Sequence, residues 1–324
     1  LNNRLTGTFD WYRRNTKDML VAGATLPATL GASVPKSNSA DMKTIGWELS
    51  LGWNDRLENG FSYWVKGVLS DYQATITKYA GNDAGFYSQS DGDGKYYVGQ
   101  KIGEIWGYHS NGLFQSDDEA ATIDQSELYA GKWGAGDVKY EDLDGDGKIT
   151  KGEETIYNPG DKSIIGNKTP RYQFGITVGF DYKNFDFEMF WQGTGKRDYM
   201  LSGAQFWGFT SQWDVPYTPA LDYWTETNTD AYFPRPGWQN GGNRVTSDRY
   251  LQSAAYGRLK NLTVGYTIPK NLTTKWGISR LRLYVTGENL LTITPLNDAF
   301  DPETLGGLTY PINRKVAIGL NLTL

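Results

Sequence analysis

The chain has 324 residues, of which 39% are hydrophobic and 15% aromatic, and its formal net charge is −5. This aromatic content can bury enough surface to exclude disorder, and so small a charge exerts no general attraction on nucleic acid. The absence of cysteine excludes disulfides and thiolate sites, and the single histidine, His109, leaves little room for a metal site or a catalytic triad. We therefore treat His109 as structural. Because no run of 18 apolar residues occurs, membrane-spanning helices are excluded, but membrane-spanning strands are not.

Eight segments alternate apolar and polar side chains with a period of two, which predicts β-strands with one apolar and one polar face. In chain order they are Thr6–Tyr12, Thr44–Trp53, Phe61–Ser70, Tyr172–Asp181, Asn184–Gln192, Leu259–Ile268, Arg280–Leu290 and Ile312–Leu324. Several carry aromatic residues near both ends of the apolar face, such as Trp47 and Trp53 in the second segment. Aromatic residues at both ends are typical of transmembrane β-barrels, whose aromatic side chains lie at the two membrane interfaces.

The connections between these segments alternate between long and short without exception. The long ones cover about residues 13–43, 71–171, 193–258 and 291–311. Since antiparallel strands alternate in direction, every long connection falls at the same end, as in outer-membrane barrels with short periplasmic turns and long extracellular loops. The prediction is an all-β protein, an antiparallel transmembrane β-barrel. Because such loops are too large for a closed eight-stranded tube, we expect about eight strands of a larger barrel.

Seven motifs occur along the chain in an order that is specific to one family. They are Lys101–Tyr108, Asn111–Phe114, Gly136–Ile149, Ile165–Pro170, Arg258–Pro269, Thr286–Leu290 and Asp301–Glu303. Through them the chain resembles the C-terminal portion of SusC-like (SusC/RagA) TonB-dependent outer-membrane transporters. The resemblance implies that residues 1–324 form the last eight strands of a 22-stranded barrel with a plugged lumen. The N-terminal plug of the family has no counterpart in this chain.

The resemblance also implies a function in the outer membrane and a set of partners. The expected function is import of oligosaccharides or oligopeptides, without catalysis by this chain. A SusD-like surface lipoprotein would act as a lid, and TonB would couple energy through the missing N-terminal part. Further partners would be the remainder of the same barrel and outer-membrane lipid. Two alternatives remain: a passive porin or surface-binding barrel without energy coupling, and, less favoured, a soluble glycan-binding β-domain.

An acidic segment matches the twelve-position calcium loop, in which carboxylates on alternate residues converge on a hard cation. The candidate ligands are Asp142, Asp144, Asp146, the backbone carbonyl of Lys148, and Glu153. Asp and Gly are also common in turns that bind no ion, so a solvated acidic turn is the alternative. Three carboxylates within five residues repel one another unless a cation neutralises them, and we therefore expect Ca²⁺ in an extracellular loop.

The connection at 193–258 is rich in aromatic residues, and for most of them we expect a small core within the loop. Three residues lie in a Pro- and Gly-rich tract, where side chains tend to be exposed. Arg235, Trp238 and Arg244 are therefore the candidate contacts to substrate or lid. Aromatic rings and guanidinium groups suit stacking on sugars or gripping peptides.

Overall fold

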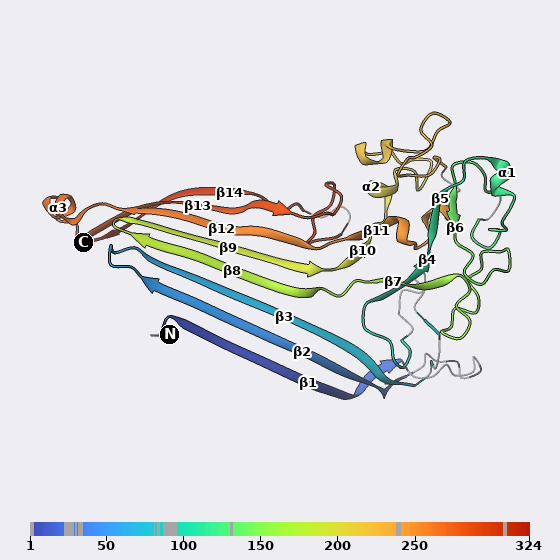
Figure 1. Cartoon of the computed structure of the whole chain (residues 1–324), viewed down its shortest axis with the longest axis horizontal. Coiled ribbons are helices and arrows are strands. Elements are labelled where there is room, and N and C mark those ends of the chain that lie inside the picture. The colour runs from blue at the N-terminus through green and yellow to red at the C-terminus, as the bar shows by residue number, and fades with distance from the viewer. Residues whose placement is uncertain are drawn as a thin grey trace.

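The computed structural model describes residues 3–22, 29, 31, 35–80, 82, 85–86, 96–129, 132–237, 241–306 and 310–324. Its main feature is one antiparallel sheet of eight long strands in the order β1-β2-β3-β8-β9-β12-β13-β14 (Figure 1). The strands are β1 (Leu5–Ala22), β2 (Lys36–Arg56), β3 (Ser62–Tyr79), β8 (Arg171–Tyr182), β9 (Phe185–Lys196), β12 (Tyr256–Thr267), β13 (Arg280–Ile293) and β14 (Lys315–Thr323). Each predicted segment corresponds to one of them, which confirms the all-β prediction.

One face of this sheet is apolar across all eight strands, because the register aligns the apolar residues of neighbouring segments. Phe9 pairs with Leu49, and Leu49 pairs with Leu69. At the other side of the sheet Val285 pairs with Ile318. These side chains are not packed into a core, since Phe9 is 64% exposed and Ile318 83%. An apolar face that points away from the protein is the arrangement of a barrel wall facing lipid.

The opposite face carries small and polar residues, and large rings lie over glycines of the neighbouring strand. Trp64 is paired with Gly179 and Tyr284 with Gly319. A Cβ atom added at either glycine would overlap the facing ring. The glycines on this inner face therefore leave room for aromatic side chains to lie flat along the sheet.

The predicted loop 13–43 is wrong over much of its length, because β1 continues to Ala22 and β2 begins at Lys36. The second and third long loops are shorter than predicted, because β3 ends at Tyr79 and β9 at Lys196. The loop predicted at 291–311 keeps its length but lies at 294–314, since β13 ends at Ile293. The last strand begins at Lys315, not at Ile312. Beyond the membrane both faces of a strand meet water or protein, so the apolar and polar alternation fades although the hydrogen-bond ladder continues.

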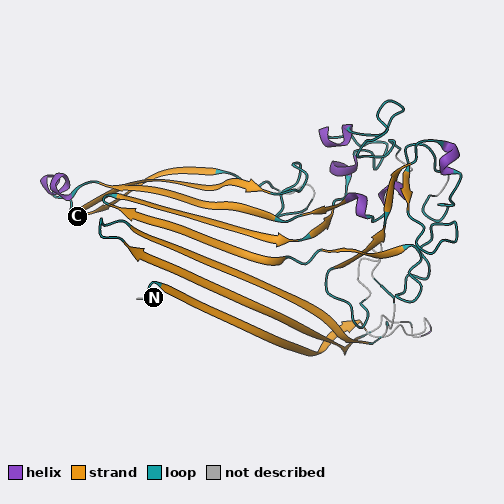
Figure 2. Cartoon of the chain, viewed as in Figure 1, coloured by secondary structure: helices purple, strands orange, loops and turns teal. Residues whose placement is uncertain are grey.

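The long connections all lie at one end of the sheet, as predicted, and two of them, 80–170 and 197–255, contain smaller elements there (Figure 1). Three two-stranded sheets pair β4 (Glu104–Tyr108) with β7 (Lys162–Asn167), β5 (Ser110–Leu113) with β6 (Val138–Tyr140), and β10 (Asp198–Met200) with β11 (Leu251–Ser253). The helices at this end are α1 (Asp117–Ala120), α2 (Ala204–Trp207), η2 (Thr218–Leu221), η3 (Gly241–Arg244) and η4 (Asp248–Tyr250). Figure 2 shows α3 (Lys270–Thr273), followed by η5 (Thr274–Trp276), at the opposite end, where the short turns lie.

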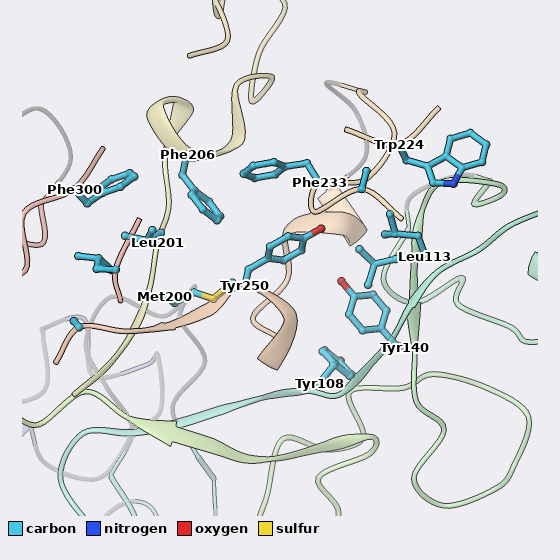
Figure 3. Close-up of a cluster of buried hydrophobic side chains, with 14 of the residues drawn as sticks. Tyr108, Leu113, Tyr140, Met200, Leu201, Phe206, Trp224, Phe233, Tyr250 and Phe300 are labelled. Carbon is cyan, nitrogen blue, oxygen red and sulfur yellow. The ribbon is translucent and has the colours of Figure 1, made fainter. Parts of the chain in front are cut away.

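Three of the long loops share one hydrophobic core, which we call the cap core (Figure 3). Its buried residues come from the first of these loops (Tyr108, Leu113, Tyr129, Val138, Tyr140, Ile149), the second (Met200, Leu201, Phe206, Trp224, Ala231, Phe233, Tyr250, Ala254) and the third (Leu296, Phe300, Leu305). Phe206 lies edge-on to both Tyr250 and Phe300, with ring centroids 6.1 and 6.3 Å away. Contacts of this kind fold the loops into a single body at the rim. In the described part of the chain no helix has the length and apolar content needed to cross a bilayer.

Candidate functional site

The acidic loop brings three of its predicted ligands together. Oxygens of Asp142, Asp144 and Asp146 all lie within 4.8 Å of one another. The Asp142 carboxylate accepts hydrogen bonds from the backbone N–H groups of Gly145 at 2.6 Å and Gly147 at 2.8 Å. The hydrogen bond from Gly147 is the main cause that lowers the pKa of Asp142. Gly147 has a φ of 82°, a conformation that favours glycine, so the sharp turn has the residue it requires.

The other two predicted ligands have different positions. The segment around Lys148 is held against Asp124: the Asp124 N–H donates to the Gly147 carbonyl at 3.1 Å, and the Ile149 N–H donates to the Asp124 carbonyl at 2.7 Å. Glu153 is not in the group of three carboxylates. Its backbone N–H donates to the carbonyl of Asn158 at 3.0 Å, within a turn beyond the acidic segment.

A buried carboxylate that the motif did not indicate closes this loop. Asp161 accepts hydrogen bonds from the N–H of Leu143 at 2.8 Å and from the N–H of Thr150 at 2.7 Å. It therefore joins the two ends of the acidic segment. Burial raises the pKa of Asp161, and repulsion from Asp144 and Asp142 adds to the rise. A cation near those aspartates would relieve the same repulsion.

Two of the three candidate contact residues line one small pocket. Arg235 and Arg244 lie at its wall, and the cavity measures about 30 Å³. The remaining wall is mainly aromatic and proline-rich: Trp207, Phe209, Ala220, Tyr223, Phe233, Pro234, Pro236, Gly237 and Asn243. Trp238 lies outside the described residues. The pocket joins two cations to a set of flat apolar surfaces, and its volume is about that of one water molecule, so only a single small group of a ligand could enter it.

The two guanidinium groups are held differently. Arg235 Nη2 lies 3.3 Å from Oδ2 of Asp137, a fully buried carboxylate, while the Arg235 side chain is 45% exposed. Arg244 donates from Nη1 to the carbonyl of Phe209 at 2.9 Å, and burial lowers its pKa. Asn243, also at the pocket wall, donates from Nδ2 to Asp137 Oδ1 at 2.9 Å. Arg235 thus leaves part of its charge at the surface, and Arg244 is the more desolvated of the two.

Most aromatic residues of this loop pack in or against the cap core, as predicted, and Trp213 is an exception that the sequence did not indicate. Phe206 and Trp224 are buried in the cap core, as expected for a loop that needs its own core. Trp213 is 83% exposed and belongs to no core.

His109 links three segments that are distant in sequence. Its Nδ1 lies 2.8 Å from Asp248 Oδ2, and its Nε2 lies 2.7 Å from Ser163 Oγ. The other oxygen of Asp248 accepts a hydrogen bond from the N–H of Ser110 at 2.9 Å. The connectivity is that of a Ser-His-Asp triad, which composition alone argued against. The contacts fasten β4, β5 and β7 to η4 and fit the structural role expected for His109.

A second cavity lies on the polar face near the short turns and measures about 550 Å³. Its lining includes the charged residues Asp181, Lys183, Asp186, Glu188, Arg280 and Arg282. Arg282 Nε donates to Asp186 Oδ1 at 2.9 Å, across β13 and β9. Charges on this face lie where a barrel has its wet lumen.

Comparison with known proteins gives a consistent family resemblance. No family model matches the chain. The chain is 30% identical to TonB-dependent receptor P3 of Formosa agariphila, 26% to TonB-dependent receptor P26 of the same organism, and 25% to TonB-dependent receptor SusC of Bacteroides thetaiotaomicron, each over 99% of its length. A solved structure of the RagAB peptide transporter superposes with a TM-score of 0.74 over 99% of the chain at 21% identity. The resemblance to SusC-like TonB-dependent transporters is therefore confirmed, and the fold is that of their barrel.

The matched region is a fraction of each relative. The chain covers 32% of receptor P3, 33% of receptor P26, 30% of SusC and 34% of the RagAB chain. It thus spans about a third of the length of the proteins it matches.

Proposed function

We propose, from the resemblance to SusC-like TonB-dependent transporters, that this chain forms part of the barrel wall and the extracellular loops of an outer-membrane nutrient importer. The observation that carries the proposal is the sheet itself: one continuous apolar face over eight strands, with every long loop at the same end. The chain performs no catalysis. Its partners are the rest of the same barrel, outer-membrane lipid, TonB acting through an N-terminal part, and a SusD-like lipoprotein lid.

The substrate class that we propose is oligopeptides or oligosaccharides. The related RagAB is named a peptide transporter. The pocket at Arg235 and Arg244 supports contact with a substrate or the lid, because two guanidinium groups border an aromatic wall. Trp238, a few residues beyond Arg235 in the same tract, would add a further flat surface.

Uptake measurements test the transport proposal. Cells that carry the intact transporter are given labelled oligopeptides or oligosaccharides, with and without a functional TonB. We expect uptake of one class that disappears without TonB. Uptake that continues unchanged without TonB would replace the proposal with a passive porin, and the absence of uptake with binding alone would favour a surface-binding barrel.

The pocket is tested by substitution of its cations. Arg235→Lys and Arg244→Lys keep the charge but remove the forked donor geometry, and Arg235→Gln removes both. We expect the glutamine variant to raise the apparent KM for uptake about tenfold, as the loss of one charge-assisted contact implies. Arg314→Gln, an exposed arginine outside the pocket, is the control. Equal KM values in all variants would remove the pocket from the transport path.

We also propose that the acidic loop binds Ca²⁺ through Asp142, Asp144 and Asp146, the three predicted ligands that the fold brings together. The clustering of three carboxylates supports the proposal. Calcium is expected to increase the resistance of this loop to protease, and Asp142→Asn with Asp144→Asn is expected to abolish the increase. Asp118→Asn, at an exposed aspartate of α1, is the matched control. If calcium did not change the protease resistance of this loop in the unaltered protein, the site would be refuted.

A further inference from the structure

The lipid-facing side of β1 and β2 changes abruptly from apolar to basic at the end toward the long loops. On β1 the apolar row ends at Trp11, and the next residue on the same face is Arg13. On β2 it ends at Ile45, and the next is Lys43. Trp11 pairs with Trp47 and Arg13 with Ile45, so the change from apolar to basic side chains occurs at nearly the same level on the two strands. The boundary is therefore a feature of the surface and not of a single strand.

Arg13 and Lys43 are neighbours on that surface. Arg13 is opposite Ile45, and Lys43 is opposite Asn15, so the two basic residues occupy diagonal positions of one antiparallel pair. Diagonal positions are about 7 Å apart, within reach of two long side chains that converge on a single group. Both belong to the same face as the apolar row, since side chains alternate strictly along a strand.

Their depth follows from the aromatic residues below them. Trp11 and Trp47 pair across β1 and β2 next to the apolar band, where tryptophan marks the interface between hydrocarbon and headgroups. Arg13 and Lys43 lie farther toward the extracellular loops than these rings. That places their charges at the level of the lipid headgroups of the outer leaflet, where long basic side chains extend from an apolar surface.

Neither cation is neutralised by a carboxylate in the described part of the chain. Arg13 is exposed, and its Nε lies 3.4 Å from Asn15 Oδ1. Asp41, the next acidic residue on this part of β2, accepts a hydrogen bond from the N–H of Asp18 at 2.8 Å. Elsewhere at the rim the arrangement differs, because Arg171 pairs with Asp71.

We propose that Arg13 and Lys43 form a binding site for the phosphate group of a phosphorylated lipid headgroup in the outer leaflet. The guanidinium of Arg13 offers a forked pair of donors that matches phosphate, and the ammonium of Lys43 adds a compact charge beside it. The tryptophans below would contact the acyl chains of the same lipid. The inference rests on the outer-membrane location proposed above and is independent of the transported substrate.

Lipid binding by the intact purified transporter in detergent tests the site. The probes are a bisphosphorylated lipid A, the same lipid without phosphates, and inorganic phosphate alone. We expect Arg13→Gln with Lys43→Gln to weaken binding of the phosphorylated lipid at least about tenfold, since the variant loses both cations that would face the phosphate. The dephosphorylated lipid should bind weakly and equally to both proteins.

The chain offers a matched control in Arg14. It is exposed, follows Arg13 directly, and points to the opposite face of the same strand. Arg14→Gln is expected to leave lipid binding unchanged. Equal affinity for the two lipids, or an equal loss in the Arg14 variant, would overturn the proposal. Displacement of the lipid by inorganic phosphate at matching concentration would do so too, because the site would then be a general anion site.

Uptake by the double variant separates this inference from the proposed function. We expect substrate uptake to be retained while lipid affinity falls. A transporter that imports nothing yet binds phosphorylated lipid through these residues would refute only the function, and one that imports substrate without lipid selectivity would refute only the lipid site.

Discussion

Arg258 on β12 and Asp301 in the last extracellular loop meet at 2.5 Å between Nη2 and Oδ2, although 43 residues separate them in the chain. Arg258 also approaches Glu303 at 3.1 Å and donates from Nε to Thr292 Oγ1 at 2.9 Å. Its side chain is 3% exposed. A cation so desolvated needs its acidic partners, so these contacts fasten the last loop to the rim of the sheet.

Loss of Arg258 should therefore detach this loop. Arg258→Gln removes the charged hydrogen-bond partner of Asp301 and leaves Glu303 with Lys260 alone. We expect a loss of roughly 2–4 kcal/mol in the free energy of unfolding, since the acids are partly solvated. Lys260→Gln removes a more exposed partner of Glu303 and should cost less than about 1 kcal/mol. Urea titration in detergent measures both. Equal effects would show that burial of Arg258 is unimportant.

A charge placed on the apolar face should be far more costly than one on the polar face. Ile176 and Thr177 are adjacent on β8 and point to opposite faces. Ile176→Arg is expected to destabilise the barrel in lipid by about 2–4 kcal/mol, and Thr177→Arg by less than about 1 kcal/mol. Unfolding from lipid vesicles gives the two values. If Thr177→Arg were the worse variant, the assignment of the two faces would be reversed.

The ring of Trp64 limits the size of the side chain that can be placed at position 179, which pairs with it across β3 and β8. Gly179→Val places side-chain atoms inside that ring, and we expect a cost of roughly 1–3 kcal/mol from overpacking. Gly67→Val is the control, because a Cβ there has no atom within 4 Å and valine favours strands. Thermal unfolding should separate the two variants clearly. A neutral Gly179→Val variant would mean that Trp64 turns away at no cost.

The acidic loop should depend on pH through Asp161. Burial raises the pKa of this carboxyl in the folded loop, so its proton is held more tightly there than in the unfolded chain. The contribution to stability is full below the ordinary carboxyl pKa of about 4 and is lost as the pH rises through the folded value. Without calcium, the backbone amides of the loop should thus be better protected from hydrogen exchange near a pH of about 4 than at neutral pH.

Hydrogen exchange, corrected for the intrinsic pH dependence of the amides, measures that protection. Asp161→Asn cannot titrate, so the fall in protection with rising pH should disappear and the opposite dependence from Asp142, whose pKa is lowered, should remain. It also leaves one of the two N–H donors, on Leu143 or Thr150, without its acceptor, at a cost of about 1–3 kcal/mol. A rise in protection with increasing pH in the unaltered protein would contradict the assignment to Asp161.

The strands within the membrane could be predicted from the sequence because water and lipid impose opposite demands on alternate side chains. Phe174, Ile176 and Val178 reveal such a strand without any tertiary information. The continuation of β1 beyond Arg13 has no comparable signal, since residues 14–18 are polar on both faces and residues 19–22 are apolar on both. β1 extends this far because its backbone forms hydrogen bonds with β2. Pairing between residues that are distant in the chain leaves no periodic pattern in the sequence.

The candidate sites show the same division. Asp142, Asp144 and Asp146 could be identified because their spacing is local. Asp161 could not, because it joins the loop through hydrogen bonds that only the folded chain defines. The partners of His109 were missed for the same reason.

The cap core has a consequence for chimeric receptors. Because Tyr140, Phe206 and Phe300 come from three different loops and lie in one core, none of these loops is a self-contained module. Grafting a single loop from a relative would expose apolar surface on the two that remain. Exchange of specificity between such proteins should therefore succeed only when the three segments are transplanted as a set.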